Sequence, residues 1–436
     1  MAQPAPAHPP TSEDAVRSAR WALAVLTLIN LFNYLDRYVP AALVESLRRS
    51  ELHVSDTQSG MLGAGFIVVF MLTSPLFGAL GDRRRRPPIV AAGVALWSLA
   101  TALAGFTRSF ASLLLARSAA GVGEAAYITV SPAFLADSFP RGERGRVFAI
   151  FNAAMPIGAA AGYILGGLVE QRFGWRAAFF IAGFPGLLLA VLMWRLRDPP
   201  RGGMDEAAGQ EGTAAAAAAG PHAGGLASVY AELLRNRPFM LTVLGYAAYT
   251  FALGALAYWT PAFLERERGM PASQATVQFG LIVVVTAFIG TFAGGWLGDM
   301  LLRRWSESYL WVSGLATLAA APVALVAFVS PSRPVYMTAI VGAEVLLFLS
   351  TGPINSALIN VVSPAHRATA MALNTLLIHL LGDVPSQPLI GRISDASSLG
   401  TAFLVLPAMM AVAGMIWIYA AFRGERAARR RLAGGA

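Results

Sequence analysis

The chain has 436 residues, of which 56% are hydrophobic and only 13% are charged, and it carries a formal net charge of +9 without a single lysine. This composition excludes an ordinary soluble domain and indicates a polytopic membrane protein. The absence of cysteine excludes disulfides, thiolate metal sites and a cysteine nucleophile.

Long apolar segments follow a short polar N-terminus. Residues 1–16 are rich in proline and alanine and lack the pattern of a cleavable signal peptide, so we expect a disordered cytoplasmic N-terminus and a retained first helix. A helix needs about 20 mostly apolar residues to cross a bilayer. Twelve segments of this kind are present, at residues 19–42, 57–80, 88–107, 112–136, 145–169, 175–196, 238–262, 274–300, 308–330, 335–359, 366–390 and 399–422.

Arginine is concentrated in alternate loops between these segments, as in the run from Arg83 to Arg86. Short loops rich in basic residues stay in the cytoplasm, so the pattern predicts that both termini are cytoplasmic and that the protein lies in the cytoplasmic (inner) membrane. The basic residues are scattered over short loops and the tail. They therefore indicate contact with anionic membrane lipids, and no nucleic-acid partner is expected.

Charged side chains inside the first and fourth segments are the strongest functional signal. The first contains Asp36 and Arg37, and the fourth contains Arg117 and Glu124. An ionised side chain at the bilayer centre costs about 2.5 to 3.5 kcal/mol on insertion scales, so such residues are functional, paired or both. Residues 117, 121 and 124 share one helical face, and we expect Gly121 to leave that face open between the charges. A fixed intramembrane salt bridge is the alternative.

An internal repeat divides the chain. The stretch from Gly78 to Arg86, after the second segment, is echoed by Gly295 to Arg304 after the eighth. Duplication of this kind places a transporter's substrate site near the bilayer midplane, between two halves that rock around it. The predicted units are an N-terminal six-helix bundle at 17–197, a cytoplasmic linker at 198–237, a C-terminal six-helix bundle at 238–423 and a basic cytoplasmic tail at 424–436.

Charged residues near the cytoplasmic helix ends form a candidate gate. We expect Asp82 to accept hydrogen bonds from a neighbouring helix end or to pair with arginine across the seam between the halves, in a latch that breaks when they rock. A purely topological role is the alternative for the arginines. The candidate gate residues are Asp82, Arg83, Arg86, Asp137, Arg146 and Asp299.

The C-terminal half offers weaker candidates. Glu344 lies in the tenth segment, while His379 and Asp383 lie one turn apart on one face of the eleventh. Glu344 is either a cavity gate or part of an interhelical hydrogen bond, and His379 either transfers protons or satisfies an internal hydrogen bond. Asp383 either lines the cavity or reaches water near the outer end of the helix. Tyr246 and Tyr249, in the seventh segment, are candidates for stacking along a lipid tail, with ordinary packing as the alternative.

Two stretches resemble signatures of the major facilitator superfamily. Gly78 to Arg86 reads Gly-x-Leu-Gly-Asp-Arg-x-Arg-Arg and is similar to the signature between helices two and three, with Arg85 where glycine is common. The glycines from Gly158 to Gly167 resemble the fifth-helix pattern, in which small residues permit close backbone packing. The resemblance implies an all-α fold with 12 transmembrane helices in two pseudo-symmetric bundles.

Three further stretches resemble the spinster branch of this superfamily: Asn33 to Tyr38, Gly121 to Asp137, and Met155 to Tyr163. The similarity is strong over residues 30–190 and only general in the C-terminal half. Sialin-like organic-anion symporters share the Asn-Tyr-x-Asp-Arg and Gly-Glu-Ala elements and are the closest alternative. Spinster-like proteins are thought to move lysolipids, including sphingosine 1-phosphate and lysophospholipids, and bacterial members are treated as proton-driven.

The resemblance implies that Asp36 and Glu124 are the protonation sites, and that Arg37 and Arg117 tune them or hold an anionic headgroup. Burial favours a neutral carboxyl group and a nearby arginine favours the carboxylate, so opening one face to water can load or release a proton. Arginine also binds phosphate through paired hydrogen bonds. Polar neighbours expected to contribute to this substrate site are Asn33, Tyr34, Tyr127 and Thr129.

We therefore expect a monomeric, proton-coupled secondary active transporter that works by alternating access and carries a lysophospholipid or sphingoid-type lipid. The alternative substrate is a soluble organic anion or sugar acid. Neither an enzyme nor a metal or cofactor is expected, since His-Glu-x-x-His and Gly-x-Ser-x-Gly motifs are absent, and the lack of lysine excludes a Gly-x-x-x-x-Gly-Lys nucleotide loop. The linker and tail are too short for the signalling domain of a receptor.

Overall fold

The computed structural model describes residues 12–434 except 203, 205–224 and 364–365. Most of the predicted disordered N-terminus and about half of the predicted linker therefore lie outside the described residues. All regular elements in the described part are helical. The N-terminal half comprises α1 (Ser12–Ala42), α2 (Val44–Arg49), α3 (Asp56–Arg83), α4 (Arg86–Ala104), α5 (Phe110–Ser138), α6 (Arg141–Phe173) and α7 (Trp175–Trp194). The linker contributes α10 (Gly225–Arg235). The C-terminal half comprises α11 (Arg237–Arg266), α12 (Ala272–Leu302), α13 (Ser308–Val329), α14 (Arg333–Phe348), α15 (Thr351–Asn360), α16 (Arg367–Ile378), α17 (Val384–Ala396), α18 (Leu399–Phe403) and α19 (Val405–Gly434).

The helices match the twelve predicted spans. Ten spans in the described residues are long and apolar enough to cross a membrane, and the tenth predicted segment is divided between α14 and α15. The first predicted span corresponds to α1. The eleventh is interrupted, because a π-helical turn at His379–Asp383, called the π turn below, separates α16 from α17. This interruption was not predicted.

Local signals in the sequence fix several helix boundaries. Ser55 caps α3, since its hydroxyl accepts a hydrogen bond from the Gln58 backbone N–H and the Gln58 side chain accepts one from the Ser55 N–H. Ser109 and Ser112 form the same reciprocal arrangement at the start of α5. Gly174 separates α6 from α7 with a φ of 78°, a conformation that disfavours residues with a Cβ atom.

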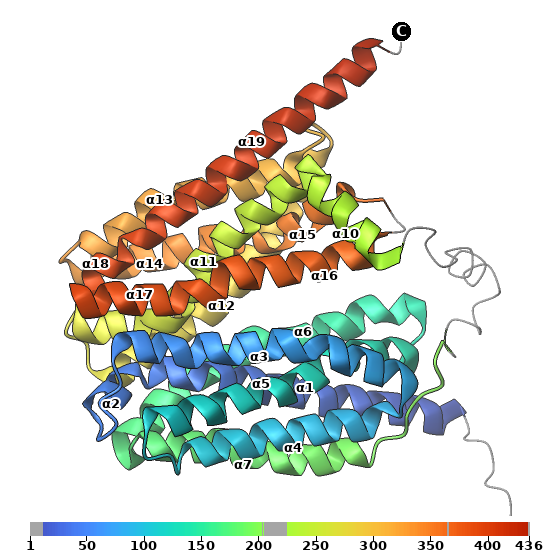
Figure 1. The fold of residues 1–436 in the computed structure, drawn as a ribbon. Helices are drawn as coiled ribbons and strands as arrows, with labels where there is room; N and C mark the ends of the chain where they lie inside the picture. Colours follow the sequence, from blue (N-terminus) through green and yellow to red (C-terminus); the bar gives the residue numbers. More distant parts are fainter. Residues whose placement is uncertain (1–11, 203, 205–224, 364–365, 435–436) are drawn as a thin grey trace, which may run out of the picture.

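Each half is a separate helical bundle, with the N-terminal half below the C-terminal half in Figure 1. Glycines on α6 allow α1 to approach closely in the N-terminal half. A Cβ atom added at Gly158 would lie 2.4 Å from the Leu31 carbonyl oxygen, and one at Gly162 would lie 2.5 Å from that of Leu35. The predicted packing role of these small residues is confirmed, because α1 and α6 touch backbone to backbone.

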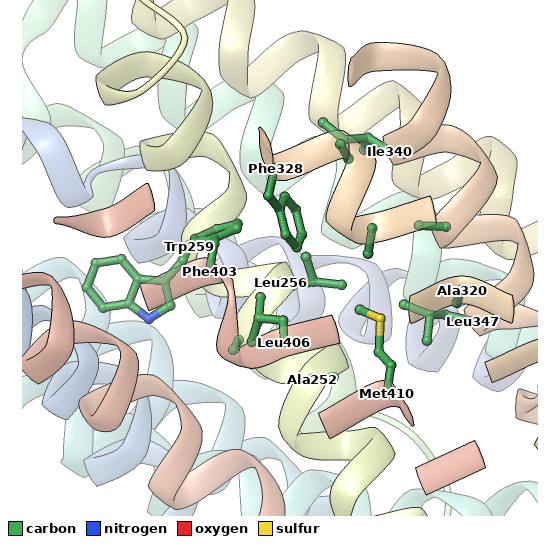
Figure 2. Close-up of a cluster of buried hydrophobic side chains, with 14 of the residues drawn as sticks. Ala252, Leu256, Trp259, Ala320, Phe328, Ile340, Leu347, Phe403, Leu406 and Met410 are labelled. Carbon is green, nitrogen blue, oxygen red and sulfur yellow. The ribbon is translucent and has the colours of Figure 1, made fainter. Parts of the chain in front are cut away.

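Aliphatic and aromatic side chains together form the core of the C-terminal half, part of which is drawn in Figure 2. Phe263 stacks on Phe403 with ring centroids 4.3 Å apart, and Phe328 meets Phe403 edge-on at 5.0 Å. Trp259 is fully buried, and its indole N–H donates to the Gln387 carbonyl oxygen at 3.2 Å. These contacts fix α11 against α13, α17 and α18.

The bundle has two ends, which we call the terminal face and the opposite face. The terminal face carries the start of α1 and the end of α19, and lies to the right in Figure 1; the opposite face carries α2 and lies to the left. Near the opposite face α3 and α17 touch closely, since a Cβ atom at Gly60 would lie 2.3 Å from the Gln387 carbonyl oxygen and one at Gly391 would lie 2.2 Å from that of Asp56. The halves are therefore in backbone contact at this end.

Candidate functional site

The four charges predicted from the sequence form two crossed ion pairs between α1 and α5. Arg117 Nη1 donates to the Asp36 carboxylate, at 3.2 Å from Oδ1 and 3.3 Å from Oδ2. Arg37 Nη2 lies 3.2 Å from Glu124 Oε1. The side chains of Asp36, Arg117 and Glu124 are at most 3% exposed, whereas that of Arg37 is 22% exposed. Arg37 is thus the most exposed member of the cluster.

The helix geometry explains why the pairs cross. Successive residues of a helix point about 100° apart, so Asp36 and Arg37 diverge from one another. Arg117 and Glu124 are two turns apart on one face of α5, and each therefore meets the opposite charge on α1. Charges of this kind are stable inside a membrane protein only when each has a partner.

Gly121 does not leave an open face between the two charges of α5, contrary to the expectation from sequence. A Cβ atom at this position would lie 2.5 Å from the Phe66 carbonyl oxygen and 3.1 Å from the Phe70 backbone nitrogen. The backbone of α3 fills the space. Gly121 therefore serves close packing of α3 on α5, and brings Phe66 against the charge cluster.

Phe66 is a site residue that the sequence did not reveal. The guanidinium carbons of Arg37 and Arg117 each lie 5.3 Å from the centre of its ring, and Arg37 also lies 5.6 Å from the Tyr34 ring. A cation over an aromatic face is stabilised by about 0.5 to 2 kcal/mol. One ring thus holds both guanidinium groups in place, but an apolar residue in an apolar helix gives no signal of this role.

A cavity of ≈ 80 Å³ opens beside this cluster, between the two halves. Its charged lining consists of Arg37 and Arg117 from the N-terminal half and Asp383 from the C-terminal half. The remaining lining residues are Tyr38, Pro40, Gly63, Phe66, Ile67, Gly254, Ala257, Tyr258 and Gln387. A solute in this cavity therefore contacts both halves and two cations at once.

The π turn brings His379 and Asp383 together, with His379 Nδ1 2.7 Å from Asp383 Oδ2. Gly254 makes room for this pair, since a Cβ atom there would lie 2.6 Å from Asp383 Oδ1. Asp383 lines the cavity, and π turns inside helices are frequent at functional sites. The two residues lie close together, as predicted, but the π turn that brings them together was not predicted.

Glu344 on α14 is a further buried carboxyl group, 3% exposed, and its Oε2 atom forms no hydrogen bond with a described residue. Tyr38, Tyr163 and Tyr249 lie within electrostatic range of it. The first two belong to the N-terminal half, so Glu344 faces the interface between the halves rather than the lipid.

Several predicted site residues pack inside the helix bundles. Tyr127 is fully buried in the N-terminal half, where its hydroxyl donates to the Leu26 carbonyl oxygen at 3.1 Å. Thr129 packs its methyl group near Gly78 on α3. Tyr246 and Tyr249 both pack against Trp417, with ring centroids 6.3 and 5.6 Å away.

Asn33 and Tyr34 lie close to the cluster, as expected. Asn33 is 1% exposed, and its side chain is within hydrogen-bonding range of Glu124, while its Oδ1 accepts no hydrogen bond from the part of the chain that the structure describes. Tyr34 contacts Arg37 through its ring. Both therefore shape the surroundings of the Arg37–Glu124 pair.

Arg86 forms the centre of the charge network at the terminal face. It is 3% exposed, and its guanidinium binds Asp137 at 2.5 Å and Asp198 at 2.8 Å. Arg201, just beyond α7, donates to the backbone carbonyl groups of Gly81 and Asp82. This network ties the start of the linker to the N-terminal half.

The other candidate gate residues do not form the expected latch across the seam. The carboxylate of Asp82 is exposed and forms no ion pair with a described residue, because Arg86 has turned inward to Asp137. Arg83 and Arg146 are exposed as well, and Asp299 accepts a hydrogen bond from the Tyr309 hydroxyl within its own half at 2.8 Å. The hydrogen bonds and ion pairs of Arg86, Arg201 and Asp299 at the terminal face stay within one half or join it to the start of the linker.

A network centred on Arg266 joins the halves at the opposite face. Its guanidinium binds Asp56 at 2.8 Å and Glu45 at 2.7 Å, both across the interface between the halves. Asp395 accepts hydrogen bonds from the backbone N–H groups of Asp56 and Thr57 at 2.9 and 2.8 Å. The sequence did not indicate this network, since the partners of Arg266 are 210 and 221 residues away along the chain.

Comparisons with known proteins agree with this architecture. The sequence profile of the Major Facilitator Superfamily matches residues 26–384. Protein spinster homolog 3 of Danio rerio is 35% identical over 414 residues, covering 90% of this chain and 80% of the relative. Protein spinster homolog 1 of Homo sapiens is 34% identical over 395 residues, covering 86% and 72%.

Two solved structures share the fold. A bacterial homologue of the human lysosomal transporter spinster, in an inward-facing and unoccupied conformation, aligns with a TM-score of 0.79 at 24% identity, covering 93% of this chain and 95% of that one. A D-xylose–proton symporter aligns with a TM-score of 0.70 at 17% identity, covering 91% and 97%. The chain therefore belongs to the spinster family of the Major Facilitator Superfamily, and it is an integral membrane transporter.

Proposed function

We propose that the protein is a proton-coupled secondary transporter that moves a lysophospholipid or sphingoid-type amphiphile across the cytoplasmic membrane by alternating access, with both termini in the cytoplasm. The observation that carries this proposal is the pair of crossed ion pairs beside a cavity that both halves line. Both arginines of the ion pairs also line that cavity. Substrate and buried carboxylates can therefore compete for the same cations.

The contacts between the halves support alternating access. The Arg266 network closes the opposite face, whereas the Arg86 network at the terminal face stays within the N-terminal half and the start of the linker. With cytoplasmic termini, this arrangement is an inward-facing state. Closing the terminal face and breaking the Arg266 network would complete the cycle around the cavity.

The coupling rests on Arg37 and Glu124. An anionic headgroup that binds the partly exposed Arg37 draws its guanidinium away from Glu124, which is 2% exposed at its side chain. A buried carboxylate that loses its cation is strongly destabilised, so it takes up a proton instead. Binding of the anion and binding of the proton therefore favour one another.

The lining favours an amphiphile. Tyr38, Phe66, Ile67 and Tyr258 present apolar surface next to the two guanidinium groups. Arginine holds a phosphate through paired hydrogen bonds, and the apolar wall accepts the first carbons of an acyl chain.

A soluble organic anion or sugar acid is the second candidate substrate. The cavity of ≈ 80 Å³ is too small for a complete lipid, so an acyl chain would have to leave it between helices. Only the lipid requires such a lateral opening.

Transport in proteoliposomes tests the proposal. A labelled lysophospholipid and a labelled sugar acid are offered separately, each with and without an imposed pH gradient. The proposal predicts uptake of the lysolipid alone, accelerated by the gradient. Uptake of the sugar acid alone would favour the second candidate substrate. Lysolipid uptake at the same rate with and without the pH gradient would contradict proton coupling.

A further inference from the structure

A second cavity, of ≈ 520 Å³, lies at the terminal face of the C-terminal half. It is formed by the loop before α13, the first turns of α13 and residues 422–426 of α19, and α13 and α19 run side by side in Figure 1. Its lining residues are Trp305, Trp311, Leu315, Phe422, Glu425 and Arg426. None of them lines the cavity between the halves, so the transport mechanism leaves this site without a role.

Two carboxylates meet at the edge of this cavity. Glu425 Oε1 accepts a hydrogen bond from the Glu307 backbone N–H at 3.1 Å. The Glu307 side chain lies over Gly424, where an added Cβ atom would be 2.5 Å from Glu307 Oε1. Burial and the neighbouring charge of Glu425 raise the pKa of Glu307. Neither carboxylate forms an ion pair with a described residue, so a cation placed between them would relieve their repulsion.

Aromatic rings form the walls. Trp305 and Trp311 have ring centroids 6.2 Å apart, and Trp305 is 38% exposed. On the other side the Arg426 guanidinium lies 4.2 Å from the centre of the Phe422 ring. Tryptophan and arginine at a helix end are typical of the level of lipid headgroups in a membrane. An ammonium group in this cavity would be attracted to both the rings and the carboxylates.

We propose that this cavity binds the headgroup of a resident aminophospholipid of the ethanolamine type, with its ammonium between Glu307 and Glu425 and its phosphate on Arg426. A primary ammonium has three N–H donors, which two carboxylates can accept together. A choline headgroup has no N–H donor, and a glycerol headgroup has no positive charge. The distribution of charge in the cavity therefore selects ethanolamine. The bound lipid is a membrane component rather than the transported substrate.

Native mass spectrometry of the purified full-length protein tests the proposal. The protein is equilibrated with equal amounts of phosphatidylethanolamine, phosphatidylcholine and phosphatidylglycerol, and the retained lipids are counted. We expect wild type to retain phosphatidylethanolamine about tenfold over the other two, as one charge-assisted hydrogen bond allows. The double variant Glu307→Gln, Glu425→Gln is expected to lose this preference. Glu143→Gln, which removes an exposed charge on α6 at the same face, is the matched control and is expected to keep it.

Thermal unfolding separates lipid binding from a structural role. In lipid-free detergent the double variant is expected to unfold at the wild-type temperature or above, because a repulsion has been removed, and to gain no stability from added phosphatidylethanolamine. Trp305→Ala provides a second variant that keeps both carboxylates and is expected to weaken the same preference. Retention of the ethanolamine preference by the double variant, or equal loss of all three lipids, would overturn the proposal. Transport of any substrate is not needed for either readout.

Discussion

Arg37 Nη2 lies 3.2 Å from Glu124 Oε1, and Arg37 is the more exposed partner, at 22% against 2% for the glutamate side chain. The cation of the pair is thus accessible from the cavity while its carboxylate is not. In the proposed mechanism an anion reaches Arg37 first, and Glu124 responds by protonation because its buried carboxylate has lost its cation. An anion in the cavity can therefore contact the cation of this pair without contacting its carboxylate. A salt bridge with two equally buried partners does not allow this.

Arg37→Gln should weaken binding of a lysophospholipid by about tenfold or more, which corresponds to loss of one charge-assisted hydrogen bond. Binding of an uncharged monoacylglycerol should change little, because its headgroup does not need the guanidinium. Arg83→Gln, an exposed arginine at the terminal face, serves as the control. Titration by intrinsic fluorescence in detergent gives both affinities. Equal losses for the two ligands would contradict the headgroup role.

Arg117→Met should lower the free energy of unfolding by about 3 to 5 kcal/mol, because it leaves the buried Asp36 carboxylate without its cation. The double variant Asp36→Leu, Arg117→Met should recover most of this loss, since no unpaired charge remains. Denaturant or thermal unfolding in detergent measures the difference. A double variant no more stable than Arg117→Met would show that the pair is not the source of the effect.

Gly121→Ala should destabilise the N-terminal half by about 1 to 3 kcal/mol, because the new methyl group would overlap the Phe66 carbonyl oxygen. Gly295→Ala is the matched control, since a Cβ atom at that position in α12 meets nothing within 4 Å. Thermal unfolding of the two variants side by side checks the prediction. Similar unfolding temperatures for the two variants would contradict the prediction, because α3 would then move away from the new methyl group without a loss of stability.

Arg266→Gln should open the opposite face, because it removes the cation between Glu45 and Asp56 and leaves two carboxylates facing each other. The distance between spin labels on Ala111→Cys and Ser332→Cys, two exposed positions at that face in different halves, reports the change. The chain has no native cysteine, so no other site is labelled. We expect a longer distance to appear in the Arg266→Gln background. An unchanged distribution would mean that helix packing alone holds this face closed.

The fold was predictable from sequence because each membrane span is a long apolar segment. Such a segment can be recognised even where its helix is interrupted. The four charges were predictable for the same reason, since Asp36, Arg37, Arg117 and Glu124 stand out in apolar surroundings. Their pairing was not, because it depends on the register of α1 against α5. Phe66 gives no signal in an apolar helix although both guanidinium groups lie over its ring.

Contacts between the halves were the least predictable part. Arg266 and its partners are separated by more than 200 residues and look like ordinary loop charges in the sequence. Asp82 was expected in a latch at the terminal face, but a latch across the halves forms in one state of a moving transporter and not in another. In this state Arg86 is bound to Asp137 and Asp198, and Asp82 is left exposed.

Proton coupling through Glu124 is tested most directly by comparing two transport modes of the Glu124→Gln variant in the same proteoliposomes. One mode is lysophospholipid uptake driven by a pH gradient, and the other is exchange of internal for external lysophospholipid without a gradient. A glutamine mimics the protonated carboxyl group, so we predict that exchange persists while stimulation by the gradient is lost. The same loss is expected for Asp36→Asn. Gradient-driven uptake at the wild-type rate by both variants would contradict the account.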